Sequence, residues 1–289
     1  MTHETTTLEA GHLKDLILNA QDLPAMPHVA SKVLELAGNP DTTAAKLQQV
    51  ISDDQAMAAR ILKIANSALY GCSRKIKTLT DAIVMLGFNT IRSLVVTSAA
   101  RNMYLKGGKS MGLKERLLWE HSMGCGIAAR LLVQMRHPQL AEEAFLAGLM
   151  HDIGKLVLNQ YASDAFDRVV QDVYNEGRMF LEVEQELLGF DHTEVGAMLV
   201  SKWKLSTQLE EAIRHHHNAD AFSVDRPVLC YLDLANNLCK REGVGFIELP
   251  DLDLMALKST QVLGFNSGEL EAMRVRLRET LESEMEIFV

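Results

Sequence analysis

Apolar residues recur at helical spacing along most of this chain, and that pattern restricts its possible folds more than any other feature. After Ser52, for example, Met57, Ile61 and Ile64 follow one another at intervals that place them on one face of a helix. Only six prolines occur in 289 residues, and Leu, Ala, Met and Glu are common. No segment shows the alternating pattern of a convincing strand. The sequence therefore predicts an all-α protein built as a multi-helix bundle.

Capping residues and glycines indicate where several helices begin and end. Ser52 with Gln55 is typical of a capping box at a helix start. A helix that begins at Thr80 is predicted to end at Gly87, because glycine favours helix termini. The Gly107–Gly108 pair is the clearest break in the chain. It separates an N-terminal helical part from the segment that holds the candidate site residues.

These breaks predict four parts in chain order. Residues 1–14 form a tail, 15–108 an N-terminal helical part, 109–245 the part with the candidate site, and 246–289 a C-terminal helical extension. The extension ends in an amphipathic helix. That helix could pack back on its own domain or form a homodimer, and packing back is the simpler expectation.

The charge balance restricts the possible partners. Lys and Arg total 29 against 38 Asp and Glu, which is the wrong sign for a protein that depends on attraction to phosphate backbones, so nucleic acid is disfavoured. The four cysteines are far apart in sequence, which fits reduced thiols in a cytosol. The N-terminus lacks an apolar signal core, and no apolar run approaches the length of a membrane span. We expect a soluble, cytoplasmic protein without a membrane partner.

Histidines extend the apolar face of one predicted helix, whose start is marked by a capping box of Thr207 and Glu210. Leu209, Ala212 and Ile213 form an apolar stripe, and the next members of that stripe are His216 and His217. Two adjacent histidines therefore continue a surface that should face the core.

A stripe of small residues precedes a second polar pair. Ala144, Ala147 and Gly148 share a helix face that continues into His151 and Asp152. Small side chains at these positions would let a neighbouring helix approach closely.

Three more polar residues occupy comparable positions. Asp191 and Glu194 form a capping box that places His192 in the first turn of a helix. His121 shares a face with apolar residues of its own helix, and Asp233 follows the apolar stripe of its segment.

Burial of these groups is unfavourable unless they are paired. One buried neutral polar group without a partner costs roughly 2–7 kcal/mol, and an unpaired carboxylate costs far more. A bound metal removes that cost for the whole set, because imidazole and carboxylate suit Fe, Mn, Zn, Ni or Co. Histidines that bond only to one another or to the backbone remain the alternative. The candidate metal ligands are His121, His151, Asp152, His192, His216, His217 and Asp233.

Residues 148–155, Gly-Leu-Met-His-Asp-Ile-Gly-Lys, resemble the defining motif of the HD superfamily of metal-dependent phosphohydrolases. Motifs similar to those of its HDOD branch occur at Leu23–Pro27, Ile51–Asp54, Ile64–Gly71, Ala82–Gly87 and Ala212–His217. The resemblance covers roughly residues 15 to 245. It implies an HD-type helical bundle, preceded by an N-terminal helical region specific to the HDOD branch, in a bacterial signal-transduction protein.

The resemblance also implies roles for the candidate ligands. It matches His121, the His151–Asp152 pair and Asp233 to the HD-type ligands, and the other histidines to additional ligands of the related HD-GYP phosphodiesterases. It implies that Asp152 bridges two ions. Lys155 lies one turn after His151 on a helix, so its ammonium could reach a substrate phosphate, with a plain surface lysine as the alternative. We expect one or two divalent ions, with Fe or Mn favoured and Zn or Ni as further candidates.

The chain departs from the HD-GYP pattern in two places. The Gly-Tyr-Pro signature is absent after His217, and Leu117 stands where those enzymes can carry a glutamate. A two-metal site is therefore a better expectation than a three-metal site, and specificity for cyclic-di-GMP is not implied.

Three functions remain open from the sequence. The first is a signalling module that binds a protein partner or a nucleotide-like ligand through a domain with a mono- or dinuclear metal centre. The second is an active phosphohydrolase or phosphodiesterase on a nucleotide or cyclic dinucleotide, with Asp152 and Lys155 as catalytic residues. The third is a metal-free interaction scaffold. An open coordination position beside a substrate-sized cleft would distinguish the second from the first.

Overall fold

The computed structural model describes residues 23–71, 74–105 and 111–288. Every regular element in these ranges is a helix, which confirms the all-α prediction. The predicted tail over 1–14 and the predicted break at Gly107–Gly108 lie outside the described residues.

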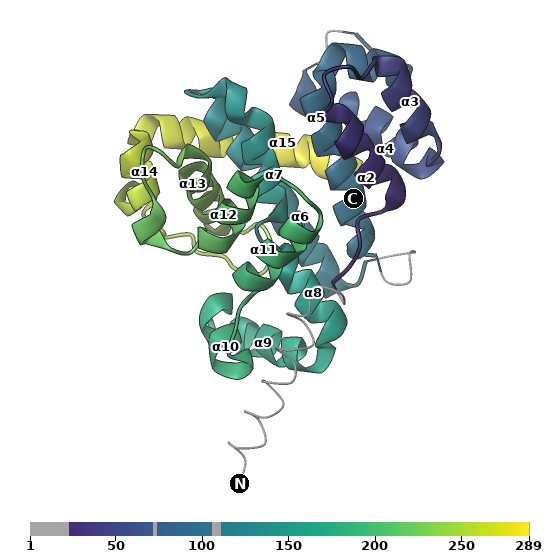
Figure 1. Ribbon diagram of the computed structural model, residues 1–289. Coiled ribbons are helices and arrows are strands. Elements are labelled where there is room, and N and C mark those ends of the chain that lie inside the picture. The colour runs from purple at the N-terminus through teal and green to yellow at the C-terminus, as the bar shows by residue number, and fades with distance from the viewer. Residues whose placement is uncertain (1–22, 72–73, 106–110, 289) are drawn as a thin grey trace.

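The N-terminal helices form one group (Figure 1). Its longest member, α5, is contacted by α2, α3 and α4. The apolar residues Ile91, Leu94 and Val95 of α5 are fully buried in this packing. The elements of the group are α2 (His28–Ala37), α3 (Ala44–Ser52), α4 (Gln55–Ala65), the short 3₁₀ helix η1 (Ala68–Tyr70) and α5 (Leu79–Met103).

Helix α5 is interrupted at Gly87, where φ is 80° and the backbone leaves the helical region. This confirms the predicted helix end, although a second helical stretch follows at once. By length and composition α5 could cross a membrane, but 61% of its most apolar window is buried within the protein. The break also leaves neither stretch with the roughly 20 residues that a span needs. We therefore assign α5 to the protein core.

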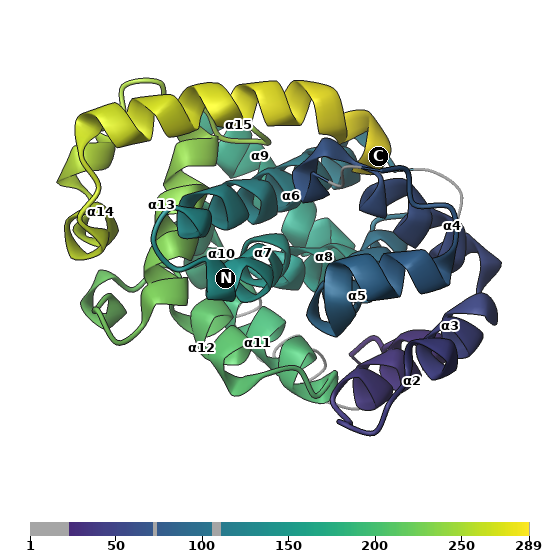
Figure 2. The ribbon, with the colours of Figure 1, turned by 90° about the horizontal axis from the view of Figure 1, so that it is seen from above.

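The second group of helices is arranged around α6. Helices α7, α13 and α15 all contact α6. Helix α15 lies along one side of the molecule and also contacts η1 and α4 of the N-terminal group (Figure 2). The elements are α6 (Leu113–Gln134), η2 (Pro138–Leu140), α7 (Ala141–Met150), α8 (Ile153–Tyr161), α9 (Ser163–Glu176), α10 (Phe180–Leu188), α11 (His192–Lys202), α12 (Thr207–His215), η3 (Ala219–Ala221), α13 (Pro227–Arg241), η4 (Leu254–Ala256), α14 (Lys258–Leu263) and α15 (Ser267–Phe288).

The N-terminal caps agree with the prediction at one helix and differ at two others. Asp191 caps α11, as predicted. Asp54 rather than Ser52 caps α4, because Ser52 is the last residue of α3 and its hydroxyl donates to a carbonyl of that helix. Ser206 rather than Thr207 caps α12. Both corrections move a helix start by only one or two residues.

Two glycines bring the helices around the site into backbone contact. A Cβ atom at Gly148 would lie 2.4 Å from the Cys125 carbonyl oxygen, so α7 approaches α6 more closely than a side chain allows. A Cβ atom at Gly154 would lie 2.0 Å from the His192 carbonyl oxygen at the start of α11. The first contact is the close approach predicted from the small residues before His151. Together the contacts fix the ends of α7, α8 and α11 relative to one another.

Candidate metal centre

The structure brings every predicted metal ligand except Asp233 into one cluster between α6, α7, α8, α11 and α12. The ring centroids of His121 and His151 lie 5.3 Å apart, those of His151 and His216 5.0 Å apart, and those of His192 and His216 5.4 Å apart. We call this set the His–Asp cluster; its members are His121, His151, Asp152, His192, His216 and His217.

Asp152 lies at the middle of the cluster, at the junction of α7 and α8. Its Oδ1 is 3.2 Å from His192 Nε2 and 3.9 Å from His216 Nε2. Its Oδ2 is 3.3 Å from His151 Nε2 and 3.8 Å from His121 Nε2. One carboxylate therefore separates the imidazole donors into two groups, one on each of its oxygens. This is an arrangement in which two neighbouring cations could share the carboxylate.

Backbone carbonyls orient three of the imidazole rings. The Nδ1 atoms of His151, His216 and His121 lie 2.7, 2.7 and 2.8 Å from the carbonyl oxygens of Gly148, Ile213 and Val244, respectively. Because a carbonyl only accepts hydrogen bonds, each Nδ1 carries the hydrogen and each Nε2 keeps its lone pair. Fixing the tautomer in this way is how proteins present histidine to a metal.

A buried glutamate orients the fourth ring. Glu184 Oε2 accepts a hydrogen bond from His192 Nδ1 at 2.5 Å and another from the His192 backbone N–H at 2.9 Å. Glu184 is fully buried on α10 and was missed in the sequence analysis. A signal for it exists, since Phe180, Glu184 and Leu188 share one helix face and both flanking residues are apolar. The same periodicity that places His216 toward the core therefore predicts that Glu184 is buried.

Several donor atoms of the cluster lack partners among the described residues. His151 Nε2 and Asp152 Oδ1 are buried and accept no hydrogen bond there. The Nε2 atoms of His192 and His216 face each other at 3.4 Å, although the Nδ1 atom of each already carries the hydrogen, and His217 Nε2 lies 3.2 Å from His192 Nε2. Buried lone pairs that face one another are unfavourable unless a cation or proton lies between them. The donor set therefore fits a divalent metal ion.

The electrostatics keep three of the histidines and Asp152 in the protonation state that metals require. Burial lowers the pKa of His151 to about 3 and lowers the pKa values of His216 and His217 well below the usual range. Burial alone would raise the pKa of Asp152, but the neighbouring His151 and Lys155 hold it well below its usual range. For His151, His216 and His217 the neutral imidazole is thus the stable form in the folded protein. His121 differs, because Cys125 and Asp152 raise its pKa although burial alone would lower it.

Asp233 does not join the cluster, contrary to the prediction from its stripe. Its Oδ2 accepts a hydrogen bond from the Ser259 hydroxyl at 2.5 Å, and its Oδ1 accepts one from the Asn237 amide at 3.0 Å. Asn236 of the same helix faces the cluster instead, with its Oδ1 3.2 Å from His121 Nε2. Helix α13 thus presents an amide, rather than a carboxylate, to the cluster.

Lys155 is a buried residue, so the surface-lysine alternative is wrong. Its side chain bonds to Asp152 Oδ2 at 2.7 Å, and its ammonium lies 4.2 Å from the centre of the Phe180 ring. The lysine is only 6% exposed. It offsets the charge of the carboxylate at the centre of the cluster.

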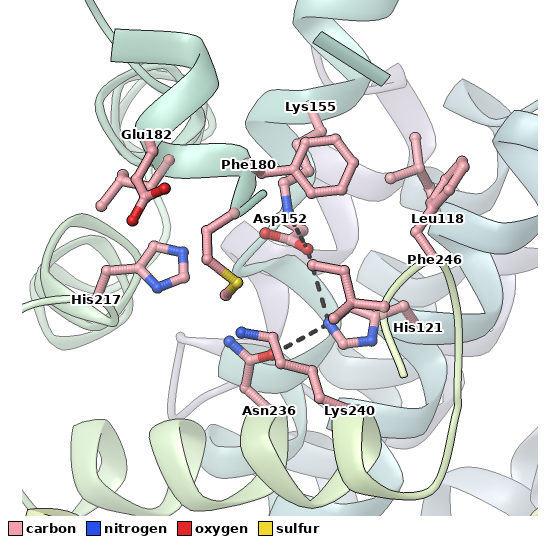
Figure 3. A pocket seen from close by; sticks show the side chains of 13 residues that line it. Leu118, His121, Asp152, Lys155, Phe180, Glu182, His217, Asn236, Lys240 and Phe246 are labelled. Carbon is pink, nitrogen blue, oxygen red and sulfur yellow. Dashed lines mark hydrogen bonds and ion pairs between the residues drawn. The ribbon is translucent and has the colours of Figure 1, made fainter. Parts of the chain in front are cut away.

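A pocket of about 190 Å³ opens beside the cluster (Figure 3). Asp152, His121 and His217 reach it from the cluster side. Lys240 of α13 also lines the pocket, and burial together with the Lys155 ammonium lowers the pKa of Lys240. Lys240 and Asn236 were not identified from the sequence. The remaining lining residues are Leu118, Lys155, Met179, Phe180, Leu181, Glu182, Asn236, Phe246 and Ile247.

Replacing Glu184 with glutamine is expected to weaken metal binding by about ten- to a hundredfold, the usual effect of losing a carboxylate behind a histidine ligand. The amide keeps the shape of the side chain but accepts more weakly from His192 Nδ1. The measurement is a competition titration against a chromogenic chelator. Glu186→Gln is the matched control, because Glu186 lies on the same helix and pairs with Arg178 at the surface. Equal affinities for both variants would contradict the role of Glu184.

Residues 23–219 match the family model of the HDOD domain. A Treponema pallidum (strain Nichols) protein, named only as uncharacterized, is 25% identical over 216 residues. That match covers 74% of this chain but 40% of the relative, so the chain spans less than half of that protein's length.

Two solved structures resemble all or nearly all of the chain. An HDOD domain protein of unknown function from Geobacter sulfurreducens has a TM-score of 0.76 and 25% identity, covering 100% of this chain and 97% of its own. A Shewanella amazonensis protein named "Putative phosphohydrolase" has a TM-score of 0.74 and 25% identity, covering 94% and 96%. The similarity thus extends beyond the matched residues 23–219 and includes the C-terminal helices.

Proposed function

Because this chain belongs to the HDOD family, we propose that it is a bacterial, cytoplasmic signal-transduction module with a mono- or dinuclear metal centre. In this proposal the module acts by binding a nucleotide-like ligand or a protein partner, and a homodimer is one form of that partnership. The metal is a divalent ion of the kind that suits imidazole and carboxylate donors, with Fe or Mn favoured and Zn or Ni as further candidates.

The unsatisfied donors around Asp152 carry the proposal. His151 Nε2 and Asp152 Oδ1 have no hydrogen-bond partner among the described residues, although both are buried. Protonation does not satisfy His151 Nε2, because burial lowers the pKa of His151 to about 3. A metal ion satisfies both atoms without a proton.

The residues of the cluster have separable roles when metal is bound. Divalent ions at the two carboxylate oxygens would act as Lewis acids toward a phosphoryl oxygen of a ligand. Asp152 would hold both ions, and the imidazole Nε2 atoms would complete the two groups of donors. Lys155 lies beside Asp152 Oδ2 and limits the negative charge of this site.

Two features favour binding over efficient turnover. Asp152 is the carboxylate that faces the imidazole Nε2 atoms in the described part of the chain, and it is already paired with Lys155. Asn236, a neutral amide, stands on α13 near His121 where a second carboxylate would add charge. A site with so little negative charge is expected to hold its metals more weakly than an anionic one. Weakly held metals would limit efficient turnover.

An active phosphohydrolase or phosphodiesterase is the second candidate function. The pocket supports it, because Asp152, His121 and Lys155 all line this opening. The Shewanella amazonensis neighbour also carries the name of a phosphohydrolase. In that case Asp152 and Lys155 would be the catalytic residues.

Elemental analysis together with a turnover assay tests both candidates. The protein is purified without chelators and without an affinity column that supplies metal, then reconstituted with Mn²⁺ or Fe²⁺. The substrate is bis(p-nitrophenyl) phosphate. We expect bound metal and no more than one turnover, whereas sustained turnover would support the hydrolase. Absence of metal even after reconstitution would contradict both and leave a metal-free scaffold.

A further inference from the structure

Lys240 is a buried lysine whose ammonium has no bonding partner among the described residues. It is 6% exposed near the end of α13. Lys155, equally buried, has its ion pair with Asp152 at 2.7 Å. Within the described part of the chain, the Lys240 ammonium has neither a hydrogen bond nor an ion pair. The two lysines of the pocket are therefore in different electrostatic situations.

An unpaired buried ammonium destabilises a folded protein, because it loses water without gaining a counter-charge. The carboxylates of Asp152 and Asp233 favour the charged form of Lys240, but neither makes an ion pair with it. The ammonium lines the pocket together with Asn236, which is 2% exposed and lies one turn earlier on the same helix (Figure 3). A charge placed at the wall of a pocket can be paired by something that enters it.

The opposite part of the pocket is apolar. Met179 and Phe180 at the start of α10 line it, together with Phe246 and Ile247 from the segment after α13. The rings of Phe180 and Phe246 meet edge to face, with centroids 5.9 Å apart. The pocket thus offers one unpaired cation and one apolar wall within a single small volume.

We propose that this pocket binds a small organic oxyanion, whose charged group pairs with Lys240 and whose apolar portion packs against Phe180 and Phe246. This inference deepens the proposed function and rests on it, since it names the class of ligand that the module binds. The charged group is a phosphate or a carboxylate, both of which accept hydrogen bonds from an ammonium and an amide.

The volume limits the size of the ligand. About 190 Å³ is below the 300–1,000 Å³ that is usual for sites of drug-sized molecules. A monophosphate or carboxylate on a single ring is of suitable size, whereas a complete cyclic dinucleotide would have to extend outside the pocket. Glu182, which is exposed, stands at the pocket and would disfavour a second anionic group there.

Calorimetric titration with phenyl phosphate and with benzoate tests the proposal. Each titration is performed on chelator-treated protein and on protein loaded with Mn²⁺, so that anion binding and metal binding are measured separately. The variant is Lys240→Met, which keeps the length of the side chain and removes its charge. Lys258→Met is the control, because Lys258 is exposed on α14 and does not line the pocket.

We expect at least one of the two probes to bind metal-free wild-type protein, and Lys240→Met to weaken that binding by roughly ten- to a hundredfold. The control variant should bind as wild type does. The stronger of the two probes identifies the oxyanion. Absence of binding in both forms of the wild-type protein would overturn the proposal while leaving metal content, and with it the metal centre, unaffected. Binding that requires Mn²⁺ and is equal in Lys240→Met would also overturn it.

Thermal denaturation separates this role from a structural one. Removing an unpaired buried cation is expected to leave the melting temperature of Lys240→Met unchanged or to raise it by about 2 °C. A lower melting temperature with unchanged anion binding would assign Lys240 to the architecture of α13 and contradict the proposal.

Discussion

Replacing Asp152 with alanine is expected to remove the bound metal and to lower the melting temperature at the same time. The metal is lost because both groups of imidazole donors face this one carboxylate. The fold is weakened because the buried Lys155 ammonium loses its partner, and breaking a buried ion pair costs about 3–5 kcal/mol. For a protein of this size that corresponds to a fall of about 10 °C. Elemental analysis and thermal denaturation measure the two effects.

Two comparisons separate these effects. Asp167→Ala removes a half-exposed carboxylate that pairs with Lys114 at the surface, and such a pair contributes only about 0–1 kcal/mol. This control should keep its metal and its melting temperature. Chelator treatment of the wild-type protein shows how much of the difference is due to metal alone. Unchanged metal content and melting temperature in Asp152→Ala would contradict the metal centre.

Replacing Gly154 with alanine is expected to destabilise the protein by about 3 kcal/mol or more, the upper end of the range for overpacked sites. The new Cβ would lie 2.0 Å from the His192 carbonyl oxygen and 2.8 Å from the Gly196 nitrogen. Both atoms belong to the backbone of α11, so α8 itself must move. The urea midpoint of unfolding measures the loss. Metal content should also fall, because the movement separates Asp152 from His192.

Gly38→Ala is the matched control for this experiment. Gly38 has a φ of -82°, and a Cβ there would meet its nearest neighbour at an ordinary distance of 3.6 Å. Alanine at that position is expected to leave stability unchanged or to raise it by up to about 1 kcal/mol. If Gly154→Ala and Gly38→Ala unfold at the same urea concentration, the backbone contact between α8 and α11 is not as close as described.

Helical periodicity was enough to predict that most of the candidate metal ligands lie close together. A residue that continues an apolar stripe lies on the same side of its helix as the stripe. The stripes that continue into His151 and His216 both face the core. The small residue at Gly148 also predicted a close helix contact, which the structure shows against Cys125. These inferences succeeded because they depend on one helix at a time.

Helical periodicity did not predict correctly where the Asp233 carboxylate lies. Asp233 and Asn236 lie three residues apart on α13, so periodicity places both on the same side of the helix. Which of them faces the cluster depends on Ser259 of α14, whose hydroxyl bonds to the Asp233 carboxylate. That partner comes from a later element, and spacing within α13 carries no information about it. Lys240 lies one turn after Asn236 on the same side of α13, so the same periodicity predicts that it also lies near the cluster.

The course of α15 has a consequence for how the chain is made. This last helix contacts η1 and α4, elements that are synthesised about two hundred residues earlier, as well as α6. Contacts of such sequence separation form late and slow folding. The N-terminal helices therefore remain incompletely covered on the ribosome until α15 has emerged. A chain that ended at residue 219, the limit of the family match, would lack that cover and also the helix that carries Asn236 and Lys240.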